Sequence, residues 1–107
     1  MLPFEVPWPA ALREVEARHR EACVAFGERD YPRARALHVE VLGACHDLDF
    51  LGGMGLSLCQ LAMIDLAEGD VDGAWVRFER GIACYEEGGH TARAVEARAL
   101  WERASAS

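Results

Sequence analysis

The sequence of 107 residues contains no lysine, so its eleven positive charges are all arginine, against eighteen aspartate and glutamate residues. The resulting net charge of −7 argues against nucleic acid as a main ligand, because phosphate binding requires a basic surface. It also argues against an anionic membrane surface and would favour a basic partner segment. Without lysine, no glycine pair here belongs to a Gly-x-x-x-x-Gly-Lys phosphate loop.

Long apolar runs are also missing, since no uncharged stretch reaches the ~18 residues that span a bilayer. Residues 1–9 lack a basic start and contain three prolines, which is unlike a secretory signal peptide. We therefore expect a cytoplasmic protein with no membrane partner and with reduced cysteines.

Paired cysteines at close spacing are absent as well. The four cysteines are Cys23, Cys45, Cys59 and Cys84. None forms the Cys-x-x-Cys spacing typical of structural zinc. His19 and Cys23, spaced i, i+4, could reach one ion from a helix face, and Cys45-His46 or the other cysteines could add ligands. Buried cysteine is more often a small hydrophobic residue, so we expect no metal and no cofactor.

No catalytic constellation stands out. A cysteine could pair with His19, His38 or His46, but catalysis needs an activated thiolate and an orienting third group. Nothing in the sequence selects one such pair. We expect no catalytic residue and a protein that is not an enzyme.

Apolar residues recur at three- and four-residue steps, which predicts five helices and no strands. The helices are expected at about residues 10–29, from an Asp30 cap to 48, at 54–68, from an Asp70 cap to 87, and from a Thr91 cap to 103. Residues 1–9 should be extended, with Phe4 and Trp8 lying against the first helix. The glycine pairs at 52–53 and 88–89 are interpreted as turn residues.

The third expected helix is apolar nearly all round, so it should lie in the middle of the stack. Asp65 interrupts it. We expect a partly buried carboxylate paired with an arginine, Arg77 or Arg98, and regard a specificity contact in a binding site as the less favoured alternative.

A 40-residue period relates Asp30 to Asp70 and Ala34 to Ala74, as expected for stacked helix pairs. The second copy resembles the tetratricopeptide repeat at matching positions, namely Leu58, Leu61-Ala62, Gly69-Asp70, Ala74, Phe78 and Gly81. The first copy matches less well, because Arg18 and Glu21 fall where apolar residues are expected and His38 where the aromatic residue should be. The length is more similar to the longer repeats of bacterial regulators than to the common 34-residue form.

This resemblance implies an all-α antiparallel helix-hairpin stack of about five helices. Residues 10–104 would form one domain, with repeats at 10–48 and 54–87 and a capping helix at 91–103. The implied function is a non-catalytic protein-interaction module that binds a partner segment, or itself, through a concave face. By the resemblance, that groove is lined by Glu16, His19, Cys23, Phe26, Leu56, Cys59, Met63 and Leu66, with Val95 and Ala99 as looser candidates.

Two further expectations follow. The apolar excess of the third helix, together with Trp101 near the open end, predicts a homodimer. The alternative function is a small-molecule or metal-binding sensor that uses His19, Cys23, Cys59 and Met63.

Overall fold

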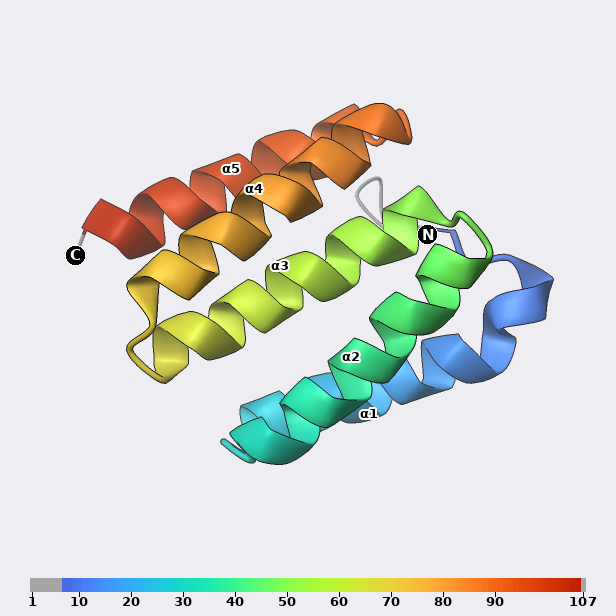
Figure 1. The fold of residues 1–107 in the computed structure, drawn as a ribbon, viewed down its shortest axis with the longest axis horizontal. Helices are drawn as coiled ribbons and strands as arrows, with labels where there is room; N and C mark the ends of the chain where they lie inside the picture. Colours follow the sequence, from blue (N-terminus) through green and yellow to red (C-terminus); the bar gives the residue numbers. More distant parts are fainter. Residues whose placement is uncertain (1–6, 107) are drawn as a thin grey trace.

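The computed structural model describes residues 7–106, so the expectation for Phe4 lies outside the described residues. A short 3-10 turn, Ala10–Leu12, leads into five helices. They are α1 (Arg13–Gly27), α2 (Tyr31–Asp47), α3 (Leu51–Ala67), α4 (Val71–Glu87) and α5 (Thr91–Ala106). Each packs antiparallel against the next, and residues 7–106 contain no strand (Figure 1). The predicted all-α architecture of five helices is confirmed.

One turn geometry repeats every 20 residues. The second residue after each of the first four helices has a left-handed backbone, at Arg29, Asp49, Gly69 and Gly89. The next N–H then donates to the carbonyl five residues earlier, as from Asp70 to Asp65 (2.8 Å). This is the hydrogen bond of a Schellman motif, in which glycine adopts the required positive φ without a Cβ penalty. The 40-residue period of the sequence thus contains two 20-residue steps with the same turn geometry.

The two predicted aspartate caps occupy corresponding corners. Asp30 accepts from the backbone N–H of Arg33 at 3.3 Å, and Asp70 accepts from that of Gly73 at 2.9 Å. Each cap satisfies a donor that the first helical turn leaves without an intrahelical partner. Both predicted caps are confirmed.

The prediction that Gly52 and Gly53 form a turn is wrong, because α3 begins at Leu51 and both residues are buried within it. The left-handed turn residue is Asp49, with φ of 52°. A Cβ on Gly53 would lie 2.5 Å from the Cys45 sulfur and 2.7 Å from the ring of Phe50. Gly53 is therefore needed for close helix packing rather than for backbone freedom.

Three helix ends also differ from the prediction. The first helix stops at Gly27 rather than near residue 29, and the last continues to Ala106 rather than ending near residue 103. Thr91 is the first helical residue of α5 and not its cap. Helix ends depend on local hydrogen bonds that periodicity does not resolve.

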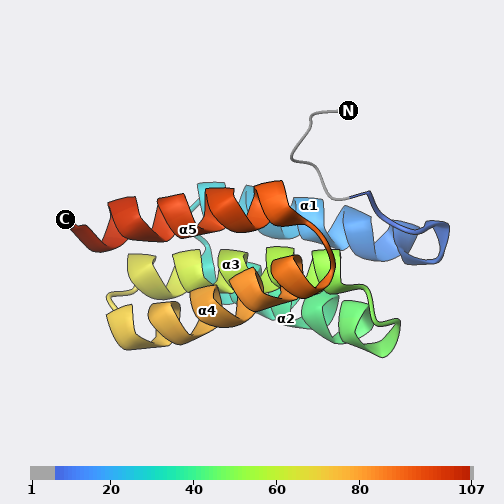
Figure 2. The same cartoon turned by 90° about the horizontal axis from the view of Figure 1, so that it is seen from above.

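Helix α3 lies in the middle of the molecule, as predicted. Helices α1 and α5 lie on one side of it, and α2 and α4 on the other (Figure 2). Eleven of the seventeen residues of α3 are buried. One cluster of the core joins α3 to α4 and α5 around Phe78 and Tyr85, and a second joins α1, α2 and α3 around Leu61 and Ile64. Trp8 packs at the N-terminal side, against Phe50.

Asp65 connects three helices. Its carboxylate, only 2% exposed, accepts from Arg35 of α2 at 3.0 Å and from Arg77 of α4. Of the two arginines predicted, Arg77 is confirmed, whereas Arg98 lies 3.5 Å from Glu86. A buried carboxylate needs such partners, because leaving it unpaired in the interior is costly.

No helix within residues 7–106 combines the length and apolar character needed to cross a bilayer.

Candidate functional site

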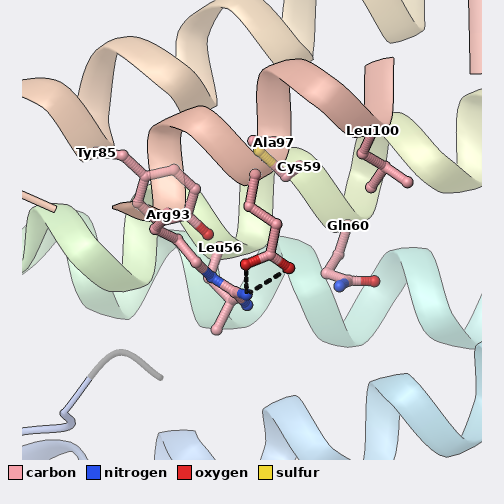
Figure 3. Close-up of a pocket in the computed structure, with 8 residues that line it drawn as sticks. Leu56, Cys59, Gln60, Tyr85, Arg93, Ala97 and Leu100 are labelled. Atoms are coloured by element: carbon pink, nitrogen blue, oxygen red, sulfur yellow. Dashed lines mark hydrogen bonds and ion pairs between the residues drawn. The ribbon is translucent and has the colours of Figure 1, made fainter. Parts of the chain in front are cut away.

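The predicted groove residues of α3 lie under α5. Leu56 and Cys59 are only 6% and 7% exposed, and they belong to the same core cluster as Ala94 and Ala97 of α5. Met63 is half-buried against that cluster, as is Leu66. A cavity of about 70 Å³ remains between α3 and α5 (Figure 3). The α3 part of the predicted groove is thus largely filled by the protein itself.

Arg93 of α5 lies in this cavity. It donates to both carboxylate oxygens of Glu96 at 3.2 Å, shown as dashed lines in Figure 3, and also pairs with Tyr85. Burial raises the pKa of Tyr85 and raises that of Cys59 to about 12. Both groups therefore stay protonated at neutral pH.

The α1 part of the predicted groove separates into three places. Glu16 forms an ion pair with Arg20 at 3.3 Å. The ring of Phe26 packs on that of Tyr31 at a centroid distance of 5.6 Å. Only His19 and Cys23 come together, as their spacing predicted, with Sγ of Cys23 3.6 Å from Nε2 of His19.

His38 of α2 completes a cluster with these two residues. Its ring lies 5.5 Å from that of His19, and the potential ligand atoms of His19, Cys23 and His38 all lie within 4.8 Å of one another. On its other side, His19 packs against the Trp8 ring at 5.8 Å. The antiparallel α1–α2 hairpin brings these three residues together. We call His19, Cys23 and His38 the His-Cys cluster.

Both histidines of this cluster have buried ring nitrogens that lack a hydrogen-bond partner among residues 7–106. His38 is fully buried, and neither of its ring nitrogens has a partner within the described residues; the same holds for Nδ1 of His19. Burial, reinforced by His19, lowers the pKa of His38 to about 4. Burial also lowers the pKa of His19, with smaller contributions from Arg93 and Arg20. Both imidazoles are therefore neutral at pH 7.

A larger hollow lies on the opposite side of α3, between α2 and α4, with α3 as its floor. We call it the α2/α4 groove. It measures about 620 Å³ and is mostly apolar, lined by Val39, Leu42, Gly43, His46, Asp47, Met54, Leu58, Arg80, Ala83 and Cys84. Sequence reasoning missed it, because the family pattern directs attention to the first helix of each pair. Val39 of this groove is 54% exposed, which the sequence alone does not show.

Comparison of the chain with protein-family models, with curated proteins and with solved structures finds no match.

Proposed function

We propose that the chain is a non-catalytic protein-interaction module of the tetratricopeptide-repeat type, and that its α2/α4 groove holds an amphipathic helix of a partner protein. The observation that carries this proposal is the groove itself, an open apolar hollow of about 620 Å³. Its polar groups lie on the flanking helices, whereas the floor offers Met54 and Leu58. Apolar anchors on one helix face match such a surface.

Charge at one end of the groove indicates the orientation of the partner. Helices α2 and α4 run in the same direction, because each is antiparallel to α3, so their last residues, Asp47 and Glu87, lie toward the same end of the molecule. Helix C-termini carry partial negative charge, to which these two carboxylates add. Basic residues of the partner helix should therefore lie at this end, in keeping with the net charge of −7.

A designed peptide can test this proposal. The probe is a fluorescein-labelled 18-residue helix with leucines at i, i+3, i+4 and i+7 spacing and arginines at one end. The matched control peptide replaces these arginines by glutamates. Fluorescence anisotropy should show saturable binding of the arginine peptide, weakened by added salt, and weaker binding of the glutamate peptide.

Two valine variants locate the binding surface. Val39→Glu places a charge in the groove and should weaken peptide binding at least about tenfold, because burying an unpaired charge is costly. Val95→Glu on α5 is the control, since Val95 is 63% exposed and lies outside the groove residues. Circular dichroism should show both variants folded.

Three outcomes would contradict the proposal. One is the absence of saturable binding, and another is an equal effect of the two valine variants. The third is a homodimer in sedimentation that Val39→Glu converts to a monomer, because a second copy would then occupy the groove.

A further inference from the structure

The His-Cys cluster has the dimensions of a metal site. In a tetrahedral zinc site with ordinary bond lengths, a thiolate sulfur and an imidazole nitrogen are about 3.5 Å apart. Cys23 Sγ and His19 Nε2 already lie 3.6 Å apart. The donor atom of His38 lies within 4.8 Å of both, so a movement of up to about 1.5 Å would bring it to the distance that two ligands keep.

The second observation is that the His38 side chain has no hydrogen-bond partner in the part of the chain that the structure describes. A buried polar side chain normally finds a partner, because an unsatisfied group costs about 1–3 kcal/mol. His38 is fully buried, and both of its ring nitrogens are unpartnered among residues 7–106. It also belongs to the buried stripe of α2 that contains Val41, a position where an apolar or aromatic side chain would fit at no such cost. An imidazole retained here is explained if it binds a ligand.

We propose that His19, Cys23 and His38 bind one Zn²⁺ ion, with a fourth coordination position open to water. Two neutral imidazoles and one thiolate are a donor set that zinc prefers, and three protein ligands leave the open position of non-structural zinc sites. Binding forms one Zn–S and two Zn–N bonds, and the Cys23 thiol loses its proton to solvent. One proton is released for each ion bound, with no redox change. This proposal is independent of the α2/α4 groove.

The charges around the cluster are compensated. Arg93 of α5 and Arg20 of α1 both act electrostatically on His19 and would oppose a cation. Arg93, however, is paired with Glu96, and Arg20 with Glu16. The bound thiolate cancels one charge of the ion, so the site is left with a net charge of about +1.

Cobalt substitution provides the first test, on the full chain purified with chelator and reductant. Co²⁺ should give the visible bands of a tetrahedral ion together with a thiolate-to-cobalt charge-transfer band in the near ultraviolet. Zn²⁺ should displace Co²⁺ at one equivalent, release about one proton at pH 7 and raise the melting temperature.

Matched variants identify the ligands. Cys23→Ser should abolish the charge-transfer band and weaken zinc binding at least about a hundredfold, since the loss of a ligand should exceed the effect of an outer-shell change. His38→Phe, which supplies an aromatic side chain, should weaken zinc binding comparably. The controls are Cys84→Ser and His46→Gln, neither of which changes a residue of the cluster.

The competing results are equally specific. Cobalt bands that persist in Cys23→Ser, or that are lost equally in Cys84→Ser, would overturn the assignment. Binding of Cu⁺ at one equivalent without measurable Zn²⁺ affinity would overturn the choice of metal. If His38→Phe does not fold, Cys23→Ser and proton release still decide, because Cys23 is an exposed residue.

Discussion

Replacing Asp65 by asparagine tests whether its ion pairs with Arg35 and Arg77 stabilise the packing of α2, α3 and α4. The substitution keeps the shape of the side chain but removes its charge. It also replaces one acceptor oxygen by an amide NH₂ group, which is a donor and would face an arginine donor. Because the side chain of Asp65 is only 2% exposed, water cannot replace the lost acceptor within the structure. Arg77 is then left without a full partner, and Arg35 keeps only its ion pair with Glu68.

The expected loss in the free energy of unfolding is about 3 kcal/mol. Removing one member of a buried ion pair costs about 3–5 kcal/mol. The low end applies here, because the side chains of Arg35 and Arg77 are 32% and 36% exposed and can regain water. In urea, with a slope of about 1.5 kcal/mol/M, the midpoint should fall by about 2 M.

The assay is urea unfolding followed by circular dichroism. The control is Glu68→Gln, which removes the exposed partner of Arg35 and should cost less than about 1 kcal/mol. Combining Asp65→Asn with Arg77→Met should give a coupling energy of about 1–3 kcal/mol. A loss below about 1 kcal/mol for Asp65→Asn, or strict additivity in this double-mutant cycle, would refute the stabilising role of the Asp65 ion pairs.

Two further predictions concern packing and thiol reactivity. Gly81→Ala should lower the free energy of unfolding in urea by about 1–3 kcal/mol, because its Cβ would lie 2.6 Å from the Cys59 sulfur. The control is Gly43→Ala, whose Cβ meets nothing within 4 Å and which should stabilise α2 by about 0.5–1 kcal/mol. Equal losses in the two variants would contradict this packing. At pH 8, iodoacetamide should modify the partly exposed Cys84 well before the buried Cys59. Burial raises the pKa of Cys59 to about 12, so only about one Cys59 thiol in ten thousand is ionised at this pH. Peptide mass spectrometry should show the two rates converging in urea, and unchanged relative rates would count against the assignment.

Local chemistry explains why much of the fold was predictable. Asp30 and Asp70 cap helices by accepting hydrogen bonds from residues three positions ahead, so the neighbouring sequence is enough to predict the caps. The apolar excess around α3 likewise predicted its central position, because a helix that is apolar on every side must be covered on several sides.

Long-range proximity explains what was missed. The sequence predicts a turn at Gly53, since it does not show that Phe50 and Cys45 approach the backbone there. His38 appeared only as a poor match to the aromatic position of the repeat. Its place beside His19 results from the pairing of α1 with α2.

The sequence by itself thus determined the five helices and the two aspartate caps, because these follow from hydrogen bonds and periodicities within a few residues. The tertiary structure alone decided which side of α3 is hollow: α5 covers Leu56 and Cys59, whereas α2 and α4 leave the larger groove between them. It also decided that two histidines and a cysteine from two helices share one cluster. Both outcomes depend on how helices that are distant along the chain pack against one another, and the periodicity of apolar residues within a helix does not show this.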